Sequence, residues 1–192
     1  MDIEQIERQL ENLLSPERLK HCIGVSTEAA RLALHYGVDV KKAELAGLTH
    51  DCVKEFDYEV MLKMCENYGL ILDEVTKNEK KLIHAQLGAV YAKVELGIDD
   101  EEVFDAIKYH TTAKANMPLL TKIIYVADYI EPSRTFEGVG ELRTLAYIDL
   151  DTATLAGLDY TINKLVGSGR MLHPETINAR NFIIQKGVTV CH

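Results

Sequence analysis

The stretch Ala46-Gly47-Leu48-Thr49-His50-Asp51-Cys52-Val53-Lys54 puts an adjacent histidine and aspartate directly after a small, apolar segment. Alanine, glycine and leucine in succession are typical of a helix that lies buried against its neighbours. A carboxylate in such surroundings requires a cation or several hydrogen-bond donors, because a lone buried charge costs several kcal/mol. The pair His50-Asp51 alone is not diagnostic, because such dipeptides recur by chance, and its meaning depends on the other polar residues of the chain.

Apolar residues along the whole chain recur mostly at spacings of three and four, and strict alternation is scarce. This spacing is the period of amphipathic helices. Ser15 with Pro16, Asp39 and Asp57 supply typical N-terminal caps, and Gly37 supplies a typical C-terminal stop. The predicted elements are an apolar helical stripe over 3–14, helices over 17–35, 39–54, 57–68, 80–96, 100–110, 118–130, 140–146, 149–166 and 174–185, and a short strand over 187–190. The sequence predicts an all-α fold, a single helical bundle.

No segment rich in serine, glycine or proline divides the 192 residues. A chain of this size buries roughly 70% of its unfolded surface, so it needs no disulfide or structural metal merely to fold. We expect one domain over residues 1–192, in which helices of about 140–186 pack onto a core of about 16–134.

The composition, 47% hydrophobic and 27% charged, excludes a disordered chain. No apolar run approaches the ~20 residues of a membrane span, and the first residues lack a secretion signal, so we expect a cytoplasmic protein that binds no membrane. A net charge of −9 argues against nucleic-acid binding, although local cations still allow a small anionic substrate. The cysteines lack CxxC spacing and are expected to be buried or free thiols: Cys22, Cys52, Cys65 and Cys191.

Further histidines and one aspartate follow an ordered pattern around His50 and Asp51, with about one helix plus a turn between successive members. Five different helices can therefore each send polar side chains toward a common centre. The members of the pattern are His21, His50, Asp51, His84, His110 and Asp128. Imidazoles together with carboxylates suit iron, manganese, cobalt or zinc, whereas the absence of cysteine argues against a structural zinc site.

Each member of this pattern also has an ordinary structural interpretation. A single histidine in a helix is more often a cap or a hydrogen-bonded residue than a ligand. Asp128 lies in the apolar run 123–130, where a salt bridge to Lys122 or Arg134 would satisfy it. The ordered combination favours a metal site over these readings.

The residues at this point resemble the HD-domain phosphohydrolase superfamily, and among its members the bacterial YqeK subgroup. The resemblance covers nearly the whole chain. It rests on Arg18-Leu19-Lys20-His21, residues 47–54, His84-Ala85-Gln86-Leu87-Gly88-Ala89, His110-Thr111-Thr112, Ala127-Asp128-Tyr129-Ile130-Glu131-Pro132-Ser133-Arg134, His173-Pro174-Glu175-Thr176 and Ala179-Arg180-Asn181. It implies a symmetrical bis(5′-nucleosyl)-tetraphosphatase, which cuts diadenosine tetraphosphate into two ADP, and it implies iron as the metal, with manganese, cobalt or zinc as substitutes.

The resemblance also implies residue roles. The first metal would be held by His21, His50, Asp51 and Asp128. His84 and His110 would either bind a second metal, with Asp51 as the bridge, or contact the phosphates, so one or two ions are expected. A bound metal lowers the pKa of its water and polarises the phosphoryl group, and the resulting hydroxide attacks the phosphoanhydride. Asp51, Asp128 and Lys54 are the residues expected to act in catalysis.

Cationic and hydroxyl side chains near the metal residues are expected to bind the polyphosphate. Lys54 lies three residues after Asp51, which predicts the same helix face for both, and Arg18 precedes His21 by the same spacing. The expected substrate-binding residues are Arg18, Lys54, His84, His110, Thr111 and Arg134. Arg170, His173 and Glu175, in and beside the loop 167–175, are further candidates, with an ordinary turn before a helix as the alternative.

Two other functions remain open on the sequence. A nucleotidase or phosphodiesterase acting on another nucleotide would use the same metal residues. A metal-dependent nucleotide sensor would use the same pocket without turnover, and a purely structural bundle is the third alternative. The native metal, the preferred nucleobase, the physiological role and the oligomeric state, including a homodimer, are not determined by these residues.

Overall fold

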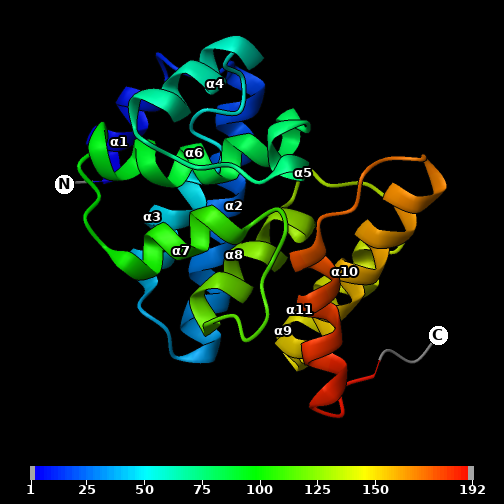
Figure 1. Cartoon of the computed structure of the whole chain (residues 1–192). Coiled ribbons are helices and arrows are strands. Elements are labelled where there is room, and N and C mark those ends of the chain that lie inside the picture. Colours follow the sequence, from blue (N-terminus) through cyan, green and yellow to red (C-terminus); the bar gives the residue numbers. More distant parts are fainter. Residues whose placement is uncertain (1–2, 190–192) are drawn as a thin grey trace.

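Helices make up all the regular secondary structure in the computed structural model, which describes residues 3–189 (Figure 1). The predicted all-α fold is confirmed over this range. The helices are α1 (Ile3–Leu10), α2 (Pro16–Tyr36), α3 (Val40–Thr49), α4 (Tyr58–Asn67), α5 (Glu74–Lys77), α6 (Lys80–Val94), α7 (Glu101–Tyr109), α8 (Leu119–Ile130), α9 (Val139–Ile148), α10 (Leu150–Gly167) and α11 (Pro174–Gln185). Within the described range, no helix has the length and apolar character needed to cross a membrane.

Local capping signals set the boundaries of α2 and α3. The Ser15 hydroxyl accepts a hydrogen bond from the backbone N–H of Arg18, and Pro16 occupies the first turn of α2. Gly37 ends that helix in the left-handed conformation, with φ of 69°. Asp39 then accepts from the N–H groups of Lys41 and Lys42, so the predicted caps at both helices are confirmed.

The helix predicted over 39–54 is wrong over residues 50–54, because α3 ends at Thr49. Nδ1 of His50 lies 2.7 Å from the carbonyl oxygen of Gly47 and occupies an acceptor that the continuing helix would use. The backbone then forms successive turns with three-residue spacing, in which Cys52 N–H donates to Thr49 at 3.1 Å and Lys54 N–H donates to Asp51 at 2.9 Å.

Two further elements differ from the prediction. The short helix α5 was not expected, and it begins where the Asp73 carboxylate accepts from the N–H groups of Val75 and Thr76. The strand predicted over 187–190 does not form over residues 187–189, where the all-helical surroundings offer no strand to pair with. Val190, like Cys191, lies outside the described residues.

Four helices form the centre of the molecule: α2, α3, α7 and α8. Each of them contacts the other helices of this group, except that α2 and α7 are not among the close pairs. Helix α8 lies in the middle and is buried almost all round, with Ile123, Ile124, Val126 and Ala127 at most 1% exposed. Gly47 allows α3 to approach α2, because a Cβ at this position would lie 2.7 Å from the Cα of Ser26.

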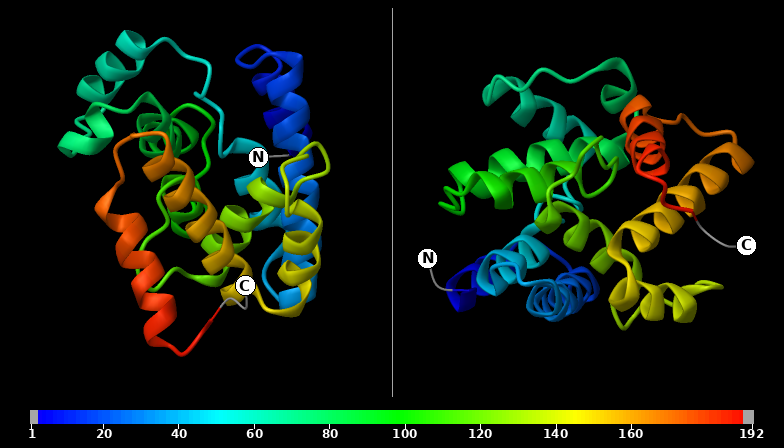
Figure 2. Two further views of the ribbon diagram at one scale, coloured as in Figure 1. Left: turned by 90° about the vertical axis from the view of Figure 1, so that its right-hand side faces the viewer. Right: turned by 90° about the horizontal axis from the view of Figure 1, so that it is seen from below.

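Helices α6, α4 and α5 lie on the α7 side of this centre, and α9, α10 and α11 lie on the α8 side (Figure 2). Helix α9 contacts α2 and α8, and α10 contacts α8, α9 and α11. A division into a core of 16–134 and a covering C-terminal part stays a prediction. Cys22, Cys52 and Cys65 are buried free thiols, as expected.

Candidate metal centre and substrate cavity

The six histidines and aspartates of the sequence pattern come from five helices. His21 lies on α2, His50 and Asp51 follow α3, His84 lies on α6, His110 follows α7 and Asp128 lies on α8. The Asp51 carboxylate is 2% exposed and lies at the middle of the group. Its Oδ1 is 3.0 Å from Nε2 of His84 and 3.4 Å from Nε2 of His110. Its Oδ2 is 3.5 Å from Nε2 of His50 and 3.9 Å from Nε2 of His21.

In two of these histidines, a hydrogen bond between the ring and the preceding helix turns Nε2 toward Asp51. His50 and His110 are the C-caps of α3 and α7, and each places Nδ1 2.7 Å from the carbonyl oxygen three residues earlier. A carbonyl oxygen only accepts, so Nδ1 carries the proton and Nε2 presents its lone pair. Burial lowers the pKa of His50 to about 4, which keeps this ring neutral near pH 7.

His21 is oriented by a carboxylate that the sequence reasoning did not select. Nδ1 of His21 lies 3.0 Å from Oε1 of Glu131, which is 1% exposed. Glu131 is itself held by the hydroxyl and the backbone N–H of Ser133. A side chain on Gly24 would occupy its space, because a Cβ there would lie 2.8 Å from Oε2. Metal-ligating histidines commonly donate their other ring N–H to a carboxylate, and His21 with Glu131 has this arrangement.

The donor set fits a divalent metal ion. The atoms of His21, His50 and Asp51, and those of Asp51, His84 and His110, form two groups whose members lie within 4.8 Å of one another. Nε2 of His21, Nε2 of His50 and Oδ1 of Asp51 are buried and lack a hydrogen-bond partner of good geometry. Buried polar atoms normally have partners, so these convergent atoms indicate a bound cation.

The charge state of Asp51 suits this role. Burial by itself would raise the pKa of the Asp51 carboxyl, but the adjacent His50 ring, the ammonium group of Lys54 and the close imidazoles of His110 and His84 hold it well below its usual range. The carboxylate is therefore ionised near neutral pH.

Asp128 contacts the His21 ring and reaches the centre only by way of this contact. Its Oδ1 lies 3.1 Å from Nε2 of His21, but Asp128 belongs to neither of the two groups described above. Arg134 pairs with the Asp128 carboxylate and donates from Nε to its backbone oxygen at 2.7 Å, whereas Lys122 pairs with Asp151. Burial opposes ionisation, but His21, His50 and Arg134 together hold the pKa of Asp128 far below its usual range.

Two predicted cations contact the centre directly. Nη1 of Arg18 lies 3.1 Å from Oδ2 of Asp51. Nζ of Lys54 lies 2.8 Å from Nε2 of His84 and 3.4 Å from Oδ1 of Asp51. Lys54 therefore reaches the site as predicted, although it does so from the turns after α3 and not from a helix face.

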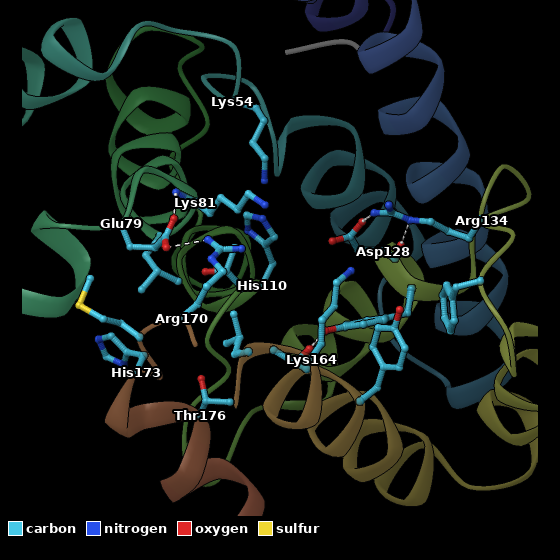
Figure 3. A pocket seen from close by; sticks show the side chains of 18 of the residues that line it. Lys54, Glu79, Lys81, His110, Asp128, Arg134, Lys164, Arg170, His173 and Thr176 are labelled. Atoms are coloured by element: carbon cyan, nitrogen blue, oxygen red, sulfur yellow. Dashed lines mark hydrogen bonds and ion pairs between the residues drawn. The ribbon is translucent and has the colours of Figure 1, made fainter. Parts of the chain in front are cut away.

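A cavity of about 550 Å³ opens beside the centre (Figure 3). The predicted residues that line it are Lys54, His110, Thr111, Asp128, Arg134, Arg170 and His173. Glu175 lines a neighbouring cavity instead, and Arg18 and His84 line neither. Arg170 is paired with Glu79 at 2.6 Å, and His173 lies 3.1 Å from Asp73, so the loop before α11 is attached to the start of α5 and α6.

The sequence reasoning missed several residues of the cavity and its support. Lys81 and Lys164 add positive charge, and the rings of Tyr129, Phe136 and Tyr160 form an aromatic wall. The Phe136 and Tyr160 ring centroids are 4.8 Å apart, and both rings lie beside Tyr129 at 6.5 and 6.3 Å. No local pattern joins these residues, because they come from α8, α10 and the segment between α8 and α9.

Arg143 on α9 is another residue that supports the site and that the sequence did not indicate. Its guanidinium donates to the carbonyl oxygens of Ile130 at 2.8 Å and of Glu131 and Arg134 at 2.9 Å. These are orphan acceptors at and beyond the end of α8. Arg143 thereby fixes the segment that carries Glu131 toward His21 and Arg134 toward Asp128.

Comparisons with known proteins agree with this geometry. The sequence model of the HD domain matches residues 18–133. The chain is 41% identical over 171 residues to the symmetrical bis(5′-nucleosyl)-tetraphosphatase of Halalkalibacterium halodurans, covering 89% of this chain and 91% of that protein. It is 36% identical over 184 residues to the protein of that name from Bacillus subtilis, covering 96% and 98%. A solved structure from Clostridium acetobutylicum, described as a predicted HD superfamily hydrolase involved in NAD metabolism, superposes with a TM-score of 0.94 at 45% identity, covering 97% of this chain and 98% of that one.

Proposed function

The chain belongs to the HD domain family, and we propose that it hydrolyses dinucleoside tetraphosphates symmetrically, converting diadenosine tetraphosphate and water into two molecules of ADP. The observation that carries the proposal is the cluster of four imidazoles around one ionised, buried aspartate, beside a cavity lined by cations. The named activity of relatives that align over nearly the whole chain supports the choice of substrate.

The HD domain implies a divalent metal, and the donor set fits one. We assign His21, His50, Asp51 and Asp128 to this ion, with iron as the native metal and manganese, cobalt or zinc as substitutes. A divalent metal at this position lowers the pKa of bound water and polarises the phosphoryl group. Iron follows from the family resemblance, since imidazole and carboxylate ligands suit all four metals.

His84 and His110 are assigned to the phosphates. The ammonium group of Lys54 lies 2.8 Å from Nε2 of His84, so a positive charge already stands where a second cation would bind to these two rings. Repulsion between cations at this distance supports a phosphate in that place. Metal analysis distinguishes the assignments, because a second metal site predicts two ions per chain.

The remaining side chains bind substrate and orient water. Lys54 and Arg134 flank the centre from opposite sides of the cavity and neutralise phosphoryl oxygens (Figure 3). Arg18 holds the Asp51 carboxylate. Because its pKa is strongly lowered, Asp128 orients the attacking water as a hydrogen-bond acceptor and does not keep the proton.

The aromatic wall of Tyr129, Phe136 and Tyr160 is assigned to one nucleobase, since bases stack on aromatic side chains. The partner is therefore a small nucleotide, and the net charge of −9 argues against nucleic acid and anionic membranes. We place the enzyme in the cytoplasm. A homodimer stays a prediction.

The test is product analysis by anion-exchange chromatography. Anaerobically purified, iron-reconstituted protein is incubated with diadenosine tetraphosphate beside a chelated control. ADP as the sole product, lost on chelation, is the expected result. ATP plus AMP would reject symmetrical cleavage but keep a metal-dependent hydrolase. Tight binding without cleavage would favour the nucleotide sensor, and activity on other nucleotides alone would favour the nucleotidase or phosphodiesterase.

A further inference from the structure

The two ends of the substrate cavity differ in chemistry. Figure 3 shows Lys54, Lys81 and Arg170 gathered on the His110 side, and Arg134 on the opposite side beside Asp128. The aromatic residues belong to the Asp128 end: Tyr129 is its neighbour on α8, and Phe136 and Tyr160 pack beside Tyr129.

The Lys54 end lacks a stacking surface. Of the described residues that line the cavity, only Tyr129, Phe136 and Tyr160 carry a phenyl or phenol ring, and all three belong to the other end. The Lys54 end instead has three cations against the single carboxylate of Glu79. Phosphate groups, and not a base, suit these surroundings.

The neighbouring cavity of about 700 Å³ offers no free ring either. It shares a wall with the first cavity at His173, which is held by its contact with Asp73 at 3.1 Å. Its one tyrosine, Tyr109, has Nζ of Lys114 4.4 Å and Nζ of Lys108 5.2 Å from its ring centroid. The ring already interacts with two ammonium groups, so a base would have to displace both, whereas Tyr160 has one ammonium group, Nζ of Lys164, at 5.6 Å from its ring centroid.

The size of the cavity points the same way. About 550 Å³ lies within the range that one drug-sized ligand fills, and a dinucleoside tetraphosphate is considerably larger. One nucleoside and the phosphate chain account for the polar and aromatic lining. The second nucleoside then lies beyond the Lys54 end, where the described lining offers no phenyl or phenol ring for it to stack on.

We infer that the enzyme recognises a nucleoside at only one end of its substrate and therefore also hydrolyses adenosine 5′-tetraphosphate, to ADP and pyrophosphate. This inference rests on the proposed function. The single nucleoside stacks at the Phe136 and Tyr160 end, and the terminal pyrophosphate lies among Lys54, Lys81 and Arg170. The central bridge of the phosphate chain then occupies the same position beside Asp51 as it does in the symmetrical substrate.

The reaction adds one water across that bridge. The water oxygen bonds to one of the two inner phosphorus atoms, and the bond from this phosphorus to the central bridging oxygen breaks. The bridging oxygen keeps the electron pair and leaves with the other half, and the proton given up by the water passes to the medium. No further reactant is needed.

The experiment compares two substrates on the same metal-loaded, full-length protein. Diadenosine tetraphosphate is expected to give ADP alone, and adenosine 5′-tetraphosphate equal amounts of ADP and pyrophosphate, with kcat/KM values within about tenfold of each other. A loss greater than this for adenosine 5′-tetraphosphate, or its cleavage to ATP and phosphate, would overturn the inference. Cleavage of diadenosine tetraphosphate alone would overturn only this inference. Cleavage of neither compound by the metal-loaded protein would also overturn the proposed function.

Two variants test the location. Tyr160→Ala is expected to lower kcat/KM for both substrates by the same factor, roughly 5- to 150-fold, because each loses the same stacking contact. Tyr160 is 36% exposed, so its replacement leaves the core intact. Lys114→Ala, in the neighbouring cavity, is the matched control and should leave both values unchanged. A decrease with diadenosine tetraphosphate alone would place the second nucleoside in that cavity and contradict one-sided recognition.

Discussion

Replacement of Glu131 by glutamine tests whether the carboxylate behind His21 sets the metal affinity. Oε1 of Glu131 lies 3.0 Å from Nδ1 of His21, and Ser133 donates to Oε2 from its backbone at 2.7 Å. Glutamine keeps the size of the side chain but has only one acceptor oxygen. If that oxygen stays with the backbone of Ser133, the amide NH₂ faces His21 and favours a proton on Nε2, the atom that points to Asp51.

The expected cost follows from the loss of this single interaction. Removal of an outer hydrogen-bond partner of a metal ligand typically costs about 10- to 100-fold in metal affinity, which corresponds to ~1.4–2.8 kcal/mol. The E131Q variant should fold, because the hydrogen bond from the Ser133 backbone survives. The metal affinity should therefore fall by this factor while the thermal unfolding of the metal-free protein changes little.

The assay is competition between the protein and a chromophoric chelator for a divalent metal, with turnover measured at saturating metal. Glu137→Gln is the matched control, because Glu137 is an exposed acid in the same segment between α8 and α9 and removes the same charge. If the E131Q and E137Q proteins bind metal with affinities within about twofold of each other, Glu131 does not set the tautomer of His21 and the reasoning is refuted.

Three further predictions concern the metal, the phosphates and the packing. Asp51→Asn should abolish turnover and deplete bound metal, since Asp51 is the carboxylate around which the proposed ligands gather; full metal content with normal turnover, measured by elemental and product analysis, would contradict its role. Lys54→Ala should raise KM or lower kcat for the tetraphosphate with metal content retained, and loss of the metal instead would show that Lys54 supports the ligands. Gly47→Ala should lower the free energy of unfolding by about 1–3 kcal/mol in denaturant titration, because its Cβ would lie 2.7 Å from the Cα of Ser26. Gly140→Ala has no atom within 4 Å of its Cβ and should stabilise α9 by about 0.5–1 kcal/mol; equal effects of the two substitutions would reject the close approach of α2 and α3.

Much of the helical layout was predictable because its signals are local. The apolar period and caps such as Ser15 and Asp39 act within one or two turns, so they can be recognised without knowledge of the fold. The boundary after Thr49 differs from the prediction because it depends on the His50 ring, which lies against the Gly47 carbonyl oxygen and ends the helix.

The metal centre could be predicted because histidine and aspartate are rare in apolar helices. The sequence predicts His21, His50, Asp51, His84 and His110 as members of one site, and the structure brings the four imidazoles together around the Asp51 carboxylate. The combination was informative because buried imidazoles and carboxylates need a common partner.

The sequence by itself determined the all-α fold, the positions of most helices and the metal-binding character of the centre, since periodicity, caps and residue chemistry are properties of near neighbours in the chain. Only the tertiary structure decided that Glu131 stands behind His21, 110 positions away, that Arg143 holds the end of α8, and that Phe136 and Tyr160 form one wall. These contacts depend on how α2, α8, α9 and α10 pack together. That packing is set by the fit of many buried side chains at once, which no single stretch of sequence records.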